Sequence, residues 1–439
     1  MNPIAKQLNQ TIENENPNLL DMLSSIGKNL FFPKGILSQS AEAKQKAYKL
    51  NATIGIAKES GKTMYFPSVM SLIDGIEAED ALTYAPSFGI PELRKVWQDS
   101  IYEKNPSLYG KKISLPVVTC GITHAISVVA DVLIDPDDVV ILPDMMWGNY
   151  NMILNVRKGA RISNYPIFTQ NGEYNLSAFE KLINTEAKKH KKITVLLNFP
   201  HNPTGYTVSE KEGDGIADIL LNAATKGTNI VTICDDSYFG LFYDDKTLKE
   251  SVFTRICDRS PNILAVKVDG ATKENYVWGL RIGFITYGCK IDGEAEKIYD
   301  ALEKKTAGCI RGNISNASHL SQTIVLKSMK DENYADEKKQ KFDILQRRAN
   351  KVKEVLLNPK YKDVWDVYPF NSGYFMCIKL HGLDAETLRL HLLDKYGVGL
   401  ISFGKSDLRI AFSCLEEMDI QELFDIIFQG AQDIKGCIT

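Results

Sequence analysis

The sequence predicts an α/β protein with a mostly parallel sheet in a large domain and a smaller α+β domain after it. Short apolar runs rich in β-branched residues alternate with helical stretches along most of the 439-residue chain. Such runs between helices are typical of strands in a parallel sheet that is covered on both faces. After about residue 320 the pattern changes to long helical stretches followed by a few strands.

The first ninety residues are predicted to contain an arm, a helical segment, an extended piece and a loop. Residues 1 to about 50 are expected to form a polar arm and a helical segment, because 41–50 are good helix formers. Residues 51–57 are a turn into an extended piece, and 82–89 are a loop with Pro and Gly. A helix is expected from about Pro91, since proline is favoured at the first helical position.

The alternating part follows. Predicted helices include 122–134 and 209–226. Four of the predicted strands run into a polar or turn-forming group, and parallel sheets bind ligands at that carboxyl edge. The predicted strands are 116–120, 138–142, 193–198, 229–234 and 263–268.

The last part of the chain is predicted to be a small α+β domain. Its expected elements are helices 317–329 and 335–356, strands 374–380 and 408–412, and a final helix 417–434. We expect three parts: 1–60 as an N-terminal arm and part of the small domain, 61–325 as the large domain, and 326–439 as the small domain.

Composition excludes several classes of protein. A formal net charge of −3 without a long basic stripe argues against nucleic acid as a partner. No segment has the length of a membrane span or the pattern of a secretory signal. The eight cysteines are scattered and the six histidines show no metal-ligand spacing. We therefore expect a cytoplasmic protein that has no metal and contacts neither membrane nor nucleic acid.

The chemistry is centred on residues 267–283, KVDGATKENYVWGLRIG. Lys273 follows a predicted buried strand, and Arg281 lies between two glycines. The amine can form a Schiff base with a cofactor aldehyde, and the guanidinium can bind that cofactor's phosphate. The alternative is a solvated surface lysine. The stretch resembles the lysine signature of class I aminotransferases, which use pyridoxal 5′-phosphate (PLP). Tyr276 and Gly270 depart from it, since the family has a small residue and often a serine there.

Two further motifs resemble the same family. In NFPHNPTG (198–205) the resemblance implies that Asn202 binds the cofactor's phenolic oxygen, although Asn-Pro and Thr-Gly are also ordinary turn chemistry. In DDSY (235–238) it implies that Asp235 keeps the pyridine nitrogen protonated and that Tyr238 donates to the phenolic oxygen. The pair of acids could instead bind a metal, but no third ligand is visible nearby.

The phosphate and ring contacts are expected from two loops. A helix start with a glycine can bind phosphate, so the resemblance makes Gly121, Ile122 and Thr123 the phosphate cup. Trp147, in MWGNY (146–150), is expected to stack on the pyridine ring and to contact substrate together with Asn202. This motif resembles the aspartate aminotransferase subgroup, which has histidine where Tyr150 stands, so the contact to the aspartate is expected to differ here.

Three residues are predicted to bind substrate or to act across a dimer. Arg409, at a strand start in the small domain, is expected to hold the substrate α-carboxylate bidentately. By resemblance, Tyr84 of the partner subunit reaches the phosphate, and Arg311 of the partner subunit binds a distal carboxylate. The alternatives are a surface ion pair for Arg409 and a solvated helix end for Arg311.

Together the motifs, which cover roughly residues 50 to 415, identify the chain as a member of the class I aminotransferases. The resemblance implies the aspartate aminotransferase fold, a homodimer, and ping-pong transfer of an amino group to a 2-oxo acid such as 2-oxoglutarate. Aspartate or glutamate is the favoured donor, and aromatic donors are possible. The alternatives are a β-lyase or decarboxylase of the same fold and, more remotely, a PLP-binding transcriptional regulator.

Overall fold

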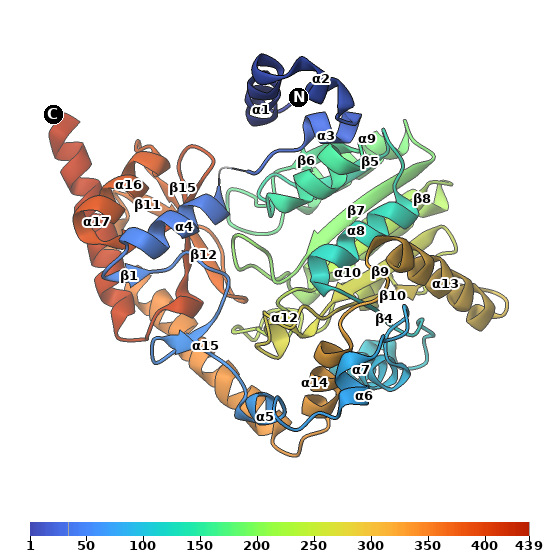
Figure 1. Ribbon diagram of the computed structural model, residues 1–439. Coiled ribbons are helices and arrows are strands. Elements are labelled where there is room, and N and C mark those ends of the chain that lie inside the picture. The colour runs from blue at the N-terminus through green and yellow to red at the C-terminus, as the bar shows by residue number, and fades with distance from the viewer. Residues whose placement is uncertain (34, 439) are drawn as a thin grey trace.

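The computed structural model describes residues 1–33 and 35–438 and has the predicted α/β architecture (Figure 1). Its main sheet has seven strands in the order β4-β10-β9-β8-β7-β5-β6. The five predicted strands of this sheet are all present, each within one residue of the expected ends. The strands are β4 (Val117–Thr119), β5 (Val139–Pro143), β6 (Arg161–Tyr165), β7 (Lys192–Asn198), β8 (Asn229–Asp235), β9 (Ile263–Asp269) and β10 (Gly283–Gly288).

Strand direction brings the predicted motifs to one edge of this sheet. Strands β6, β5, β7, β8 and β9 are parallel, and only β10 runs antiparallel to its neighbours β9 and β4. Asn198 at the end of β7 is in register with Asp235 at the end of β8, and β9 ends beside them. The sequence analysis did not name β6 and β10.

Alternate residues of each strand pack on opposite faces, as the period of two requires. Val140 and Leu142 of β5 belong to one apolar cluster, with residues of α8, η2 and α13. Val139 and Ile141 belong to the other, with residues of α9, α10 and α11. These covering helices are α8 (Gly121–Leu133), η2 (Asn151–Arg157), α9 (Leu176–Ala187), α10 (Glu210–Thr225), α11 (Phe253–Ile256) and α13 (Ala295–Asn313).

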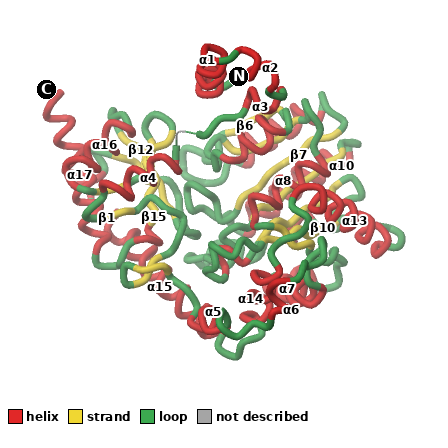
Figure 2. The backbone as a smooth tube through the Cα atoms, in the orientation of Figure 1, coloured by secondary structure: helices red, strands yellow, loops and turns green. Residues whose placement is uncertain are grey.

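A second, four-stranded sheet of order β11-β12-β15-β14 lies in the C-terminal part of the chain (Figure 2). The strands are β11 (Trp365–Val367), β12 (Phe375–Leu380), β14 (Ile401–Phe403) and β15 (Asp407–Ala411). The helices of this part are α14 (His319–Met329), α15 (Tyr334–Leu356), α16 (Ala385–Tyr396) and α17 (Asp419–Ile438).

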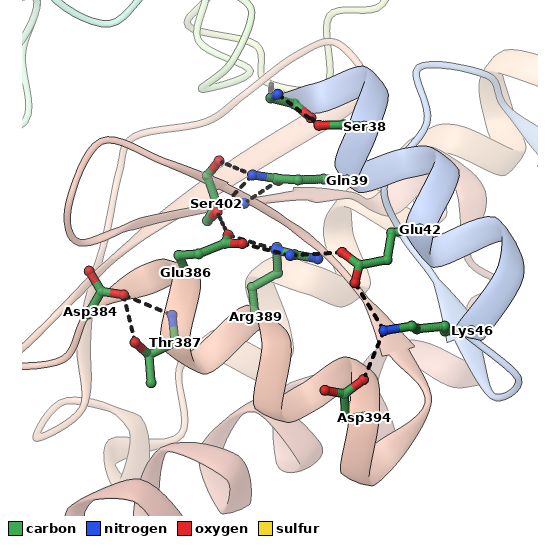
Figure 3. A network of polar contacts seen from close by, with 11 residues as sticks. Ser38, Gln39, Glu42, Lys46, Asp384, Glu386, Thr387, Arg389, Asp394 and Ser402 are labelled. Carbon is green, nitrogen blue, oxygen red and sulfur yellow. Dashed lines mark hydrogen bonds and ion pairs between the residues drawn. The ribbon is translucent and has the colours of Figure 1, made fainter. Parts of the chain in front are cut away.

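The N-terminal segment joins both parts of the molecule. Helix α4 (Ile36–Lys46) and β1 (Leu50–Asn51) lie against the C-terminal part, where β1 pairs with β13 (Val398–Gly399). Figure 3 shows how α4 is fixed: Gln39 bonds the backbone and hydroxyl of Ser402, and Arg389 pairs with Glu42 and Glu386. By contrast, α3 (Ser25–Asn29), which follows α1 (Pro3–Glu15) and α2 (Pro17–Met22), contacts η2 beside the seven-stranded sheet (Figure 1).

The remaining elements are the 14-residue helix α7 and several short helices, strands and turns. They are β2 (Lys58–Glu59), β3 (Lys62–Thr63), α5 (Pro67–Ser71), α6 (Ala78–Leu82), α7 (Pro91–Lys104), α12 (Ala271–Glu274) and the 3₁₀ turns η1 (Pro106–Leu108), η3 (Pro359–Tyr361) and η4 (Phe412–Cys414). The predicted domain boundaries at residues 60 and 325 stay a prediction.

Candidate active site

A cavity of about 350 Å³ opens at the carboxyl edge of the parallel strands. Eight of the predicted site residues line it, although they come from five separate segments of the chain. These eight are Ile122, Thr123, Trp147, Asn202, Asp235, Tyr238, Lys273 and Arg281. The shared edge therefore brings together side chains that lie far apart in the sequence.

Lys273 is presented by the single turn of α12, directly after β9. Its Nζ lies 4.8 Å from the centroid of the Tyr238 ring. Burial lowers the pKa of the Lys273 amine to about 8; the positive charge of Arg281 lowers this pKa further, and the negative charge of Asp235 opposes the shift. A fraction of the amine is therefore unprotonated near neutral pH and able to act as a nucleophile or base.

Arg281 lies directly against the start of α8. A Cβ on Gly121 would come within 2.5 Å of Arg281 Nη2, so only glycine allows this approach. Gly121 also has a φ of +78°, which favours glycine. One space suited to a phosphate therefore lies between the Arg281 guanidinium and the first turn of α8. The free backbone amides of Ile122 and Thr123 are in this turn.

The two departures from the lysine signature have structural causes. A Cβ on Gly270 would lie 2.6 Å from the carbonyl oxygen of Ile282, so the serine that the family often has would not fit this backbone without a shift. Tyr276 is buried and packs edge-on against Phe66 and Trp278. It thus belongs to the core beneath the turn.

Asp235 is buried and its carboxylate is held by three donors. Oδ1 accepts hydrogen bonds from the backbone amide of Ser237 at 3.0 Å and from its hydroxyl at 2.5 Å. Oδ2 accepts one from the Tyr150 hydroxyl at 2.5 Å. Burial and the adjacent negative charge of Asp235 raise the pKa of Tyr150, so its hydroxyl stays protonated and donates. The contact expected to differ at position 150 is therefore made by a phenol.

Asn198 links the motif that contains Asp235 to the motif that contains Asn202. Its Nδ2 donates to the backbone oxygen of Asp235 at 2.9 Å, and its Oδ1 accepts from the Asn202 amide at 2.8 Å. The Asn202–Pro203 peptide is cis. Burial lowers the pKa of neighbouring His201 to about 4, and this ring bonds Thr204 and the backbone of Met145.

Arg409 is buried on β15 without a carboxylate partner among the ion pairs of the described chain. Its Nη2 donates to the backbone oxygen of Thr53 at 2.8 Å, and Nη1 lies 3.3 Å from Asn202 Oδ1. Its Cζ lies 4.2 Å from the centroid of the Phe375 ring, and its Nε has no partner. Burial lowers the pKa of this guanidinium.

A second cavity, of about 910 Å³, adjoins the first, and Trp147 and Asn202 line both. The larger cavity is also lined by Arg409, which contacts Asn202. Its outer wall includes the network of Figure 3, in which Arg389 is already paired with Glu42 and Glu386. Apolar side chains from the N-terminal segment, the Trp147 loop, η2 and β14 also line this cavity: Phe31, Ile36, Met146, Met152, Ile401 and Phe403.

Tyr84 and Arg311, predicted to act in the partner subunit's site, are both on the surface. Tyr84 is 90% exposed. Arg311 is exposed at the C-terminal end of α13, where Nη1 donates to Ser315 Oγ at 2.7 Å. Neither lines the two cavities of its own chain.

The sequence analysis missed five residues that line the smaller cavity: Gly55, Asn198, Ser237, Thr272 and Trp278. The position of Asn198 at the end of a predicted strand was a usable signal. Trp278 had none, because a tryptophan in an apolar stretch is usually core.

Within the described part of the chain, no group of three or more His, Cys, Asp or Glu residues could hold a metal ion. No helix of that part is long and apolar enough to cross a membrane. All seven cysteines described there are free thiols.

Comparison with known proteins shows the family of this chain. Residues 49–427 match the family described as Aminotransferase class I and II, and the chain belongs to this family. Its relatives include a probable N-acetyl-LL-diaminopimelate aminotransferase of Bacillus subtilis (27% identical, covering 79% of this chain and 82% of that protein) and a probable aspartate/prephenate aminotransferase of Aquifex aeolicus (26%, 77% and 81%).

Solved structures show the same fold. An aminotransferase from Anaerococcus prevotii has a TM-score of 0.81 at 23% identity and covers 93% of this chain and 98% of that one. The cytoplasmic aspartate aminotransferase of Saccharomyces cerevisiae has a TM-score of 0.78 at 19% identity, covering 95% and 99%. The predicted aspartate aminotransferase fold and the enzyme class are therefore confirmed.

Enzymes of this family use PLP, and the residues of the smaller cavity fit that cofactor. The close approach of Gly121 and Arg281 leaves a cationic, amide-lined space for a phosphate. Trp278 Nε1 is a buried donor without a partner at the same cavity. When PLP is bound, Asp235 would supply a buried anion for a protonated ring nitrogen, and Lys273 would supply the amine for the aldehyde.

Proposed function

We propose that this aminotransferase moves the amino group of an L-amino acid to a 2-oxo acid such as 2-oxoglutarate, with aspartate or glutamate as favoured donors. The observation that carries the proposal is the meeting of Lys273, Asp235 and Asn202 at one sheet edge, beside the unpaired guanidinium of Arg409. Two half-reactions would use this one site in turn.

Each residue of the site has a distinct task in the proposal. PLP, when bound, withdraws the electrons left at the substrate Cα after the proton is removed. The unprotonated amine of Lys273 would take the proton from the substrate Cα and give it to C4′, the carbon of the cofactor aldehyde. Arg409 binds the α-carboxylate and so fixes the Cα–H bond relative to Lys273. Trp147 and Asn202, which line both cavities, would hold the ring and the substrate.

The preference for dicarboxylates rests on a homodimer, in which Arg311 of the partner subunit would pair with the distal carboxylate. The exposure of Arg311 and of Tyr84 in the single chain is consistent with residues that act across an interface. An arginine can meet a carboxylate bidentately, whereas an apolar group would leave the charge unpaired. We also infer that this dimer is cytoplasmic, which the free thiols support.

Bulkier donors, aromatic ones included, are a second candidate. The 910 Å³ cavity beyond Arg409 has several apolar walls and exceeds what aspartate would fill. The relatives named for N-acetyl-LL-diaminopimelate and prephenate are consistent with a site that accepts more than aspartate. One site that uses a dicarboxylate in one half-reaction could use a larger amino acid in the other.

The test is a panel of amino acids against 2-oxoglutarate and oxaloacetate, with each half-reaction followed by cofactor absorbance. Formation of a 2-oxo acid from the donor supports amino transfer. Release of carbon dioxide or free ammonia instead would favour the decarboxylase or β-lyase alternative and contradict the proposal.

Arg311→Ala tests the dicarboxylate preference. We expect kcat/KM for aspartate to fall roughly tenfold to a thousandfold, the equivalent of about 1.5 to 4 kcal/mol for a charge-assisted pair. The matched control is Arg259→Ala, which removes another surface arginine, paired with Asp218. An unchanged value for Arg311→Ala, or no activity of the parent with dicarboxylates, would remove Arg311 from the site.

A complementation experiment tests the shared site. Tyr84→Ala and Lys273→Ala should each be inactive as homodimers. When the two variants are mixed and allowed to exchange subunits, one site of each heterodimer should regain both residues, and activity should return in part. A fully active monomer would contradict the shared site.

A further inference from the structure

The residue after Lys273 is a buried carboxylate held by two lysines. Glu274 Oε1 accepts hydrogen bonds from Lys104 Nζ at 2.8 Å and from Lys338 Nζ at 2.6 Å. The Glu274 side chain is 3% exposed, against 20% for Lys104 and 30% for Lys338. We call these three residues the Glu274 clamp.

The two lysines come from different helices. Lys104 ends α7, and Lys338 lies in the second turn of α15. The next residue along the chain is also held by α15, because the Tyr334 hydroxyl donates to Asn275 Oδ1 at 2.9 Å. Both residues that follow Lys273 are thus bonded to the first turns of one helix.

Helix α15 continues from this clamp to the part of the molecule that carries Arg409. Lys341 pairs with Glu59 at 2.7 Å. Further along, the buried Arg348 donates to the backbone oxygen of Ser413 at 2.9 Å, in the turn that directly follows β15. One 23-residue helix therefore connects the turn that bears Lys273 with the end of the strand that bears Arg409 (Figure 1).

The charge on Glu274 is what makes this connection strong. Burial alone would raise the pKa of Glu274, but the two lysines outweigh it and lower the pKa to about 2. The carboxylate is therefore ionised throughout the working pH range. The charges that shift the pKa of Lys273 itself are those of Asp235 and Arg281, so the effect expected of the clamp is on the position of Lys273.

We propose that Glu274 is a positioning residue, which locks the turn of Lys273 onto α7 and α15 and so fixes the amine relative to Arg409. The expected effect on proton transfer rests on the proposed function of Lys273, whereas the expected effect on PLP capture does not. Catalysis depends on such placement, since a misplacement of about 1 Å can cost about 100-fold in rate.

The first test is covalent capture of PLP by the apoenzyme, trapped with borohydride and mapped to Lys273, which needs no amino acid. Glu274→Gln keeps the shape but removes the charge, and we expect capture to slow about tenfold or more. Glu303→Gln is the matched control: Glu303 is also a buried carboxylate, bonded to Arg94 of the same helix α7 at 2.6 Å. It should lower the melting temperature without slowing capture.

The second test separates positioning from stability. With Glu274→Gln, kcat per PLP-loaded site should fall about tenfold to 100-fold while KM stays within about threefold. The isotope effect on kcat with an α-deuterated donor should rise, because proton transfer becomes slower. Lys338→Gln should show the same pattern more weakly, because the side chain of Lys338 is more exposed. If Glu274→Gln does not fold, the test is carried out with Lys338→Gln instead.

Two outcomes would overturn the inference. One is that Glu274→Gln behaves like Glu303→Gln, with lower stability but unchanged capture and isotope effect. The other is that Lys338→Gln leaves both readouts at the parent values. A parent enzyme that captures PLP but transfers no amino group would contradict the proposed function instead, and the capture rates would still decide the role of Glu274.

Discussion

Replacing Tyr150 with phenylalanine removes one of the three hydrogen-bond donors to the Asp235 carboxylate and keeps the aromatic ring. A hydrogen bond to a charged group contributes about 1.5 to 3 kcal/mol, and an abandoned buried acceptor adds to the loss. The 2.5 Å contact and the burial of both residues favour the upper half of this interval. We therefore expect Tyr150→Phe to lower the free energy of unfolding of the apoenzyme by about 2.5 kcal/mol. Because the anion that faces the ring nitrogen is then less well oriented, PLP affinity should fall about tenfold, which is about 1.4 kcal/mol.

The assay combines urea unfolding with a PLP titration followed by absorbance. Tyr165→Phe is the control, because Tyr165 is a buried tyrosine at the end of β6 whose hydroxyl bonds a neutral group, the Tyr174 hydroxyl, at 2.6 Å. A neutral pair contributes about 0.5 to 1.5 kcal/mol, and PLP affinity should not change. If Tyr150→Phe loses stability but binds PLP as the parent does, Tyr150 supports the fold and not the cofactor site.

Three other outcomes are expected. Gly121→Ala should raise the dissociation constant of PLP at least about tenfold, since the new Cβ would meet Arg281 at 2.5 Å; equilibrium dialysis measures this, and parent-like binding would contradict the phosphate cup. Asp235→Asn should keep the fold by circular dichroism but slow proton abstraction by about 100-fold or more, and transamination at the parent rate would disprove its role. The pKa of Lys273 is about 8, below its ordinary 10.5, so the unfolded chain binds more protons between these values. The contribution of Lys273 to apoenzyme stability should therefore rise with pH from about 8 to 10.5. The stability of the parent relative to that of Lys273→Met should increase over this range in pH-dependent urea unfolding, and a constant difference would contradict the lowered pKa.

Most of the sheet and much of the site could be predicted because local chemistry signals them directly. Runs such as 193–198 and 229–234 are apolar, β-branched and ended by a polar residue, and both are strands that end at the cavity. β6 was not predicted because Arg161, Ser163 and Asn164 break the apolar pattern of an edge strand. β10 begins at Gly283, immediately after the lysine signature, and its antiparallel direction is a tertiary property.

Contacts between distant segments could not be predicted in the same way. Nothing in the sequence around Tyr150 indicates that its hydroxyl reaches Asp235, 85 residues further on. The same holds for Glu274, whose partners Lys104 and Lys338 lie 170 residues before it and 64 residues after it. Such pairs depend on how helices and strands pack, and a single sequence carries no record of that packing.

Two buried arginines of the C-terminal part show why the partners of a charge matter more than its burial. Arg389 pairs with Glu42 and Glu386, and its charge is balanced within the protein. Arg409 is equally buried, yet within the described chain it contacts only neutral oxygens and an aromatic face, and its Nε has no partner. A buried charge without a counter-ion costs free energy of folding. This difference supports our proposal that Arg409 binds a carboxylate, whose charge would offset that cost, whereas Arg389 fastens α4 in place.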